Sequence, residues 1–167
     1  MPSRRPPPKT PPPQAPRAPT PELQGLLDAV RALHEALTAF DLGAAHALEV
    51  NRSDLQALLM LEHGPRPARD LSQALGLSSG ATTALIDRLE HAGLVQRSAS
   101  QSDRRVTLVG LSGPAFRRIG GLYAGLFRAF VGSVETAPAR NLEAATQVLR
   151  VLATTCQEAA ALAREGR

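Results

Sequence analysis

Residues 66–112 contain closely spaced helix-capping serines and helix-ending glycines. Each helix or strand in this region is therefore expected to be short. A helix is expected from Pro67 to Leu75 because Gly76 follows it, and glycine ends helices by adopting the left-handed backbone conformation. Ser78 supplies a hydroxyl that can cap a second helix, which is expected to reach about His91. The spacing therefore predicts two short helices joined by a tight turn.

A β-hairpin is expected directly after these two helices. Leu94–Arg97 and Val106–Leu111 alternate in polarity and contain valine and leucine, which is typical of short strands. The segment Ser98–Arg104 between them is polar and is expected to form the hairpin tip. The order of these elements predicts a helix-turn-helix followed by a β wing.

Longer helices are expected on both sides of this region. Apolar residues recur at helical spacing from Pro21 to about residue 48, and Thr20 can cap that helix. Further helices are expected at about 52–62, 112–134 and 138–163. The predicted fold class is therefore mainly α with a small β wing.

The first twenty residues differ in composition from the rest. Residues 1–20 hold most of the fourteen prolines and carry arginines and a lysine without any acid. Proline lacks the backbone donor that helices and sheets need, so this segment is expected to be extended and disordered. It is an inert tail, a polyproline ligand for a partner, or a basic arm that adds nonspecific affinity for a polyanion.

The net charge of +4 is placed unevenly along the chain. Residues 22–63 are acidic, whereas residues 1–21 and 64–118 are basic. A basic surface on one part of a protein suits a polyanionic partner. Chance scatter over a solvated surface is the alternative, and the small net charge alone favours nucleic acid only weakly.

Other classes of protein find little support. No apolar run reaches the ~18 residues that span a bilayer, and an apolar leader is absent, so a cytoplasmic protein without membrane contact is expected. The lone Cys156 is expected to be a small hydrophobe buried on a dimer seam rather than a redox sensor. The four histidines lack metal-ligand spacing, so neither a metal nor a cofactor is expected. No nucleophile, phosphate-loop or zinc-hydrolase motif indicates an enzyme.

The sequence of residues 68–112 resembles the MarR (multiple-antibiotic-resistance regulator) family of winged-helix repressors. The matching stretches are ARDLSQALGL at 68–77, LIDRLEHAGLV at 85–95 and SDRRVTLV at 102–109. The wing signature of that family is Asp-x-Arg, five residues and then Leu-Thr. Asp103, Arg105 and Leu111 meet it here, and Ser112 stands in place of the threonine.

The resemblance implies that residues 51–112 bind duplex DNA, with the second short helix in the major groove and the wing in the neighbouring minor groove. It makes Arg105 the groove-inserting residue, Asp103 its orienter and Arg104 a phosphate contact. The expected contacts on and before the second helix are Ser78, Ser79, Gly80, Ala81, Thr83 and Arg88. Most of these are small residues or hydroxyls, so specificity is expected to lean on Arg88, the wing and DNA shape. Arg66, Arg69 and Arg97 are weaker candidates for phosphate contact.

The resemblance further implies a homodimer, in which residues 21–50 and 113–167 of the two chains interleave, and hence a pseudo-palindromic operator. A repressor released by a small aromatic effector is also implied, with His34, Met60 and Tyr123 as candidate lining residues. The competing interpretation is a winged-helix dimerisation or protein-interaction module with little specific DNA binding. The small residues of the second short helix favour that alternative.

Overall fold

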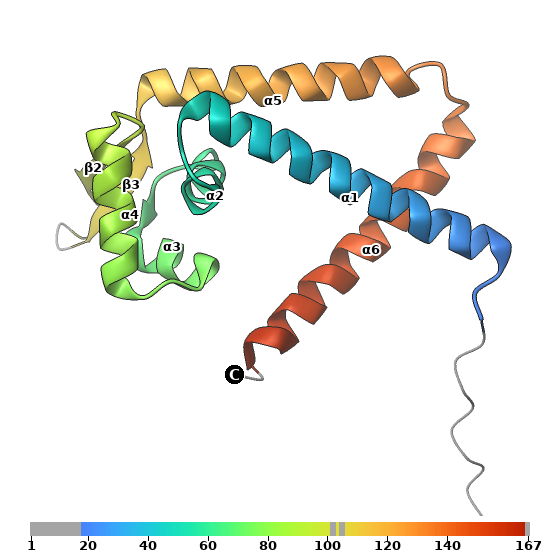
Figure 1. Ribbon diagram of the computed structural model, residues 1–167, viewed down its shortest axis with the longest axis horizontal. Helices are drawn as coiled ribbons and strands as arrows, with labels where there is room; N and C mark the ends of the chain where they lie inside the picture. Colours follow the sequence, from blue (N-terminus) through green and yellow to red (C-terminus); the bar gives the residue numbers. More distant parts are fainter. Residues whose placement is uncertain (1–17, 101–102, 104–105, 166–167) are drawn as a thin grey trace, which may run out of the picture. The chain divides into compact units, whose positions relative to one another are not determined.

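Helices dominate the chain, and its strands are short. The computed structural model describes residues 18–100, 103 and 106–165. The elements are, in chain order, α1 (Pro21–Leu48), α2 (Arg52–Leu61), β1 (Arg66–Pro67), α3 (Ala68–Leu75), α4 (Ser79–His91), β2 (Val95–Ala99), β3 (Thr107–Leu111), α5 (Gly113–Val134) and α6 (Ala139–Glu165) (Figure 1). The chain divides into two compact units between Leu55 and Gln56. The prediction of a mainly α protein with a small sheet is confirmed.

Local sequence sets both ends of α1. The Leu23 backbone N–H donates to the Thr20 hydroxyl oxygen over 3.3 Å, as predicted for a capping residue. Hydrogen bonds from its own backbone N–H and from the Thr20 side chain lower the pKa of Glu22, whose charge suits the positive end of the helix dipole. At the far end, Glu49 adopts a left-handed φ of 58° and its N–H donates to the His46 carbonyl oxygen, so the helix stops there.

The second unit contains the predicted helix-turn-helix and a three-stranded antiparallel sheet. The strand order is β1-β3-β2, so β3 is central. Helix α3 contacts α4, and α4 contacts β2. Aliphatic side chains from these elements and from α2 and α5 make the core: Leu58, Leu71, Leu85, Ile86, Leu89, Val109 and Ile119 are all at most 2% exposed. Packing of these side chains fixes the two short helices against the sheet.

Glycines make the turns around α3 and α4. Gly76 and Gly93 have φ angles of 65° and 67°, and the sequence predicts this left-handed conformation for Gly76 at the end of α3. Gly110 is needed for a different reason, because a Cβ atom there would lie 3.1 Å from Pro65 Cγ. The segment before β1 therefore passes close over the central strand.

The observed strands differ from the sequence prediction in two places. Strand β1 is too short to show alternation, and Pro67, which the periodicity assigns to a helix, pairs with Leu108 instead. Strand β2 continues into the segment expected to be the hairpin tip, because Ser98 pairs with Leu108 and Ala99 pairs with Thr107. Cross-strand pairing extends the hairpin beyond the point where the apolar alternation ends.

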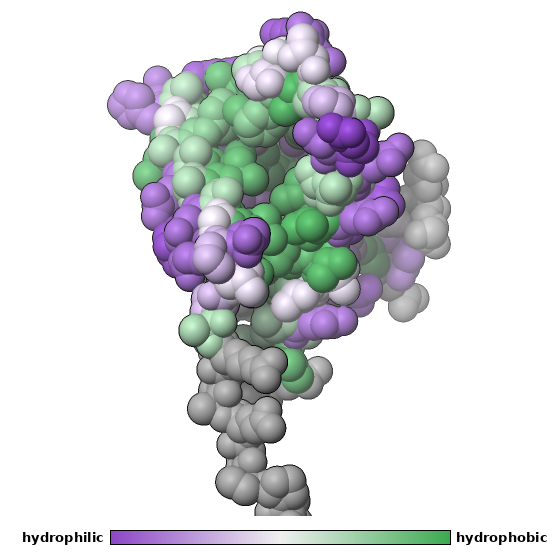
Figure 2. Space-filling model, turned by 90° about the vertical axis from the view of Figure 1, so that its right-hand side faces the viewer, coloured by the Kyte–Doolittle hydropathy of each residue, from purple (hydrophilic) through white to green (hydrophobic). Residues whose placement is uncertain are grey.

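Large apolar side chains remain exposed on the long helices. In α5 and α6 they are Phe116, Phe127, Phe130, Val131, Val134, Leu142, Leu149, Val151 and Leu162, and in α1 they are Leu23, Leu26, Leu27, Leu33, Leu37 and Leu42. Figure 2 shows such apolar residues, in green, at the molecular surface. None of the helices in the described parts of the chain is both long and apolar enough to cross a bilayer.

Replacing Leu71 by alanine should lower the free energy of unfolding by about 2–5 kcal/mol, because it empties a fully buried site on α3. Urea denaturation followed by circular dichroism measures the loss. Gln73→Ala on the exposed side of the same helix is the control and should change stability by less than ~0.5 kcal/mol. Equal costs for the two variants would contradict the packing of α3 described above.

Candidate functional site

Helix α4 has one buried face and one exposed face. Thr82, Leu85, Ile86 and Leu89 are each at most 2% exposed and turn toward the core. The exposed positions of its first two turns are Ser79, Gly80, Ala81, Thr83 and Ala84. The outward face therefore carries only small or hydroxyl-bearing residues over these turns, so that another molecule can approach the helix backbone closely.

Hydroxyl groups order the start of α4. The Ser78 hydroxyl oxygen accepts a hydrogen bond from the Ala81 backbone N–H over 3.2 Å, as the sequence predicts. The hydroxyls of Thr82 and Thr83 donate to the carbonyl oxygens of Ser78 and Ser79 over 2.9 and 3.0 Å. Each threonine side chain is thereby held in one orientation, and the first turn of α4 still directs backbone N–H groups and partial positive charge outward.

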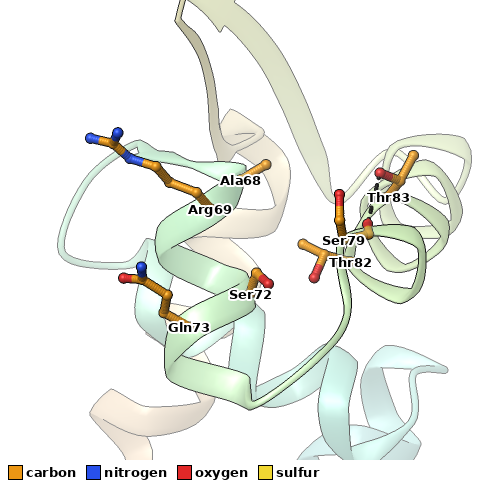
Figure 3. Close-up of a pocket in the computed structure, with 7 residues that line it drawn as sticks. All are labelled: Ala68, Arg69, Ser72, Gln73, Ser79, Thr82 and Thr83. Carbon is orange, nitrogen blue, oxygen red and sulfur yellow. Dashed lines mark hydrogen bonds between the residues drawn. The ribbon is translucent and has the colours of Figure 1, made fainter.

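A pocket of about 260 Å³ lies between α3 and α4. Its lining residues, drawn in Figure 3, are Ala68, Arg69, Ser72, Gln73, Ser79, Thr82 and Thr83. The side chains of Arg69 and Gln73 point away from α4, so the wall facing that helix is made of small and hydroxyl side chains. The sequence predicts Ser79 and Thr83 as site residues and Arg69 as a weaker candidate, whereas Ser72 and Gln73 are not among the predicted residues.

The hairpin joining β2 to β3 is closed by backbone hydrogen bonds. The Ser100 N–H donates to the Val106 carbonyl oxygen, and the Val106 N–H donates to the Asp103 carbonyl oxygen, both over 2.9 Å. The Asp103 N–H in turn lies 3.4 Å from the Ser100 hydroxyl oxygen. Asp103 is therefore held at an exposed turn. Arg104 and Arg105, to which the sequence assigns the main contacts of the wing, lie outside the described residues.

Arg97 joins strand β2 to helix α4. Its Nη2 atom lies 2.5 Å from Asp87 Oδ1, and its Nη1 atom donates to Glu90 Oε2. The hydrogen bond to Asp87 and the charges of both acids raise the pKa of Arg97. The sequence suggests a phosphate contact for this residue, whereas the guanidinium is already engaged by two carboxylates. Arg66, weighed for the same role, donates from Nε to the Met60 carbonyl oxygen over 3.2 Å.

The remaining predicted residues are spread over several elements. Arg88 is exposed near the end of α4. Of the suggested effector-lining residues, His34 is exposed on α1, and Met60 and Tyr123 are half-buried on α2 and α5. None of the three lines the pocket between α3 and α4.

Cysteine and potential metal ligands add no further site. Cys156 is exposed in the single chain, and its burial at a dimer seam stays a prediction. Within the residues that the structure describes, no group of three or more histidine, cysteine or acidic side chains is placed to hold a metal ion.

Comparison with known proteins identifies this arrangement of elements. Residues 48–106 match the model of the MarR family. The uncharacterized HTH-type (helix-turn-helix) transcriptional regulator YcgE of Bacillus subtilis (strain 168) is 41% identical over 80 residues, which are 47% of this chain and 52% of YcgE. The chain spans about half the length of the curated relatives it matches.

Solved structures share the fold over a longer stretch. A MarR family protein from Bacillus stearothermophilus has a TM-score of 0.65 at 22% identity, covering 81% of this chain and 96% of that one. RV1404 from Mycobacterium tuberculosis has a TM-score of 0.66 at 20% identity, covering 83% and 97% of the two chains. The predicted winged-helix fold is thereby confirmed.

Replacing Ser78 by alanine should lower the free energy of unfolding by about 1 kcal/mol, because the Ala81 N–H loses its acceptor. Ser78→Asp is the matched variant: it restores an acceptor and places negative charge at the positive end of α4, so it should keep the parent stability. Thermal unfolding of the three proteins measures both effects. A stable alanine variant would mean that Ser78 does not cap α4.

Proposed function

We propose that this chain is a DNA-binding transcriptional regulator, because residues 48–106 match the model of the MarR family and a relative 41% identical over 80 residues is named as such a regulator. The observation that carries the proposal is the winged-helix arrangement itself, in which α4 packs on α3, exposes its first turns and lies against the β2–β3 hairpin. A helix of this kind fits the major groove of duplex DNA, and an adjoining hairpin reaches the neighbouring minor groove. The curated relatives are themselves named as transcriptional regulators.

In this proposal the start of α4 contacts the DNA backbone and the edges of the bases. The exposed N–H groups of its first turn favour a phosphate oxygen, and Ser78, Ser79 and Thr83 provide hydroxyls. Gly80 and Ala81 permit close approach and contact with thymine methyl groups. These residues offer no bidentate base contact, so Arg88 and the sequence-dependent shape of DNA supply much of the specificity.

The wing supplies the second contact. Arg105 enters the minor groove, Arg104 binds a phosphate, and the Asp103 carboxylate orients Arg105 by a charge-assisted hydrogen bond. Support comes from the sequence signature and from the hydrogen bonds that hold the Asp103 backbone at the turn between β2 and β3. A preoriented arginine loses less conformational entropy on entering a narrow groove.

The functional form is a homodimer that represses transcription from a pseudo-palindromic operator. The exposed apolar side chains of α1, α5 and α6 support this part of the proposal, because a second chain is the partner that covers such surfaces in a symmetric oligomer. Two α4 helices in one dimer then meet two half-sites about one DNA turn apart. Release by a small aromatic effector near His34, Met60 and Tyr123 completes the proposal and rests on family resemblance.

A protein-interaction module is the second candidate function. The absence of long polar side chains from the exposed first two turns of α4 favours it, because such a surface reads few bases directly. The two candidates differ in their response to salt, since only DNA binding releases condensed counterions.

The affinity of the purified protein for duplex DNA should fall at least tenfold between about 50 and 200 mM salt, because several arginines displace counterions. Fluorescence anisotropy with a duplex selected by the protein from a random pool measures this dependence. Affinity that is absent or insensitive to salt would favour the interaction module.

Arg105→Ala should weaken binding to the selected duplex by about 1–3 kcal/mol, because it removes the groove-inserting side chain. Arg150→Ala, which removes the same charge from an exposed position on α6, is the control and should bind as the parent does. Gel-shift titration at fixed salt compares the three proteins. Equal losses in the two variants would refute a specific role for the wing arginine.

A further inference from the structure

The Asp87 carboxylate lies on the face of α4 that faces DNA in the proposed function. Residues 79, 83 and 87 follow one another at four-residue intervals, so Asp87 lies on the same side of the helix as Ser79 and Thr83. Its side chain is 58% exposed. Glu90, one turn further along, is 38% exposed by the same measure. Two negative charges at this place oppose the approach of a phosphate backbone.

Arg97 contacts both of these carboxylates from the neighbouring strand. One guanidinium nitrogen is 2.5 Å from Asp87 and another donates to Glu90. A guanidinium has five N–H donors in a planar fork, so a single arginine can satisfy two acids at once. The side chain of Arg97 is 35% exposed, less than the 58% of Asp87, so the guanidinium is the more shielded of the two groups.

Arg97 also lies at a structural junction. It is the central residue of β2 and pairs with Val109, a fully buried residue of the middle strand. The ion pairs therefore join the base of the wing to the outer side of α4. They add a polar connection to the core packing that already holds these two elements together.

We infer that Arg97 is a positioning residue of the DNA-binding surface. Its single positive charge offsets part of the negative charge of Asp87 and Glu90, its ion pairs connect β2 to α4, and it does not bind a phosphate itself. The inference rests on the proposed function. Removal of Arg97 uncovers two negative charges on the DNA-facing surface, so its effect on binding depends on whether those charges are present.

A double-mutant cycle tests this dependence. Arg97→Ala is made in the parent and in an Asp87→Asn/Glu90→Gln background, and each protein is titrated with a duplex of about 30 base pairs selected by the parent from a random pool. Arg97→Ala should weaken binding roughly three- to tenfold in the parent, as expected for two exposed ion pairs, and less than about twofold in the neutralised background. Arg97→Gln in both backgrounds repeats the cycle if the alanine variant does not fold.

Arg31→Ala is the matched control. Arg31 pairs with Asp28 over 2.9 Å on α1, so its removal also deletes one cation and uncovers one acid, but outside the winged helix. It should leave DNA affinity unchanged. Circular dichroism and gel filtration confirm that each variant keeps the parent fold and assembly.

Two results would overturn the inference while leaving the proposed function intact. An equal loss of affinity in both backgrounds would mean that Arg97 binds phosphate directly, and no loss in either would mean that its ion pairs do not influence the surface. If the parent itself selected no duplex, the proposed function would fail and this inference with it.

Discussion

Burial of one side of α4 determines what its other side can do. Leu85, Ile86 and Leu89 are almost fully buried, and Thr82 is buried with its hydroxyl bonded to the Ser78 carbonyl oxygen. With this face held in the core, rotation of the helix about its axis would expose aliphatic surface to water. Such exposure costs about 25 cal/mol of free energy for each Å². The small residues of the opposite face are therefore presented in one fixed direction.

The outward face of α4 also carries charged side chains. The exposed side of α4 carries acids in its later turns, although its first turns are suited to an anionic partner. Arg97 comes from a strand that contacts the helix, and its guanidinium pairs with both carboxylates. The wing thus contributes to the helix surface through its base as well as through its tip.

Local signals explain which features could be predicted from the sequence. The caps at Thr20 and Ser78 and the glycine that ends α3 depend on residues within one helical turn, so their patterns are visible in the chain. Strand β1 could not be predicted, since its two residues form a strand only by pairing with β3. The ion pairs of Arg97 with Asp87 and Glu90 could not be predicted from the sequence either. They form only because core packing brings strand β2 and helix α4 together.

The family resemblance came from the same local patterns. It predicted the winged helix correctly, since the pairing of β2 with β3 follows their order in the chain. The shape of the pocket between α3 and α4 depends on how the two helices pack against each other. Only some of the residues that line this pocket are therefore predicted from the sequence. The sequence predicts which residues share one face of a helix, whereas it does not give the distance between two packed helices.

Ser112 links the two ends of the winged helix. Its hydroxyl donates to the Gly93 carbonyl oxygen over 2.7 Å and accepts from the Ala115 N–H over 3.2 Å, while its own N–H donates to the Leu94 carbonyl oxygen over 3.0 Å. The residues that end α4 are thus fastened to the first turn of α5, a helix about 33 Å long. One serine therefore sets where α5 begins relative to the residues that follow α4, so the direction in which the long helix leaves the winged helix is anchored at this residue.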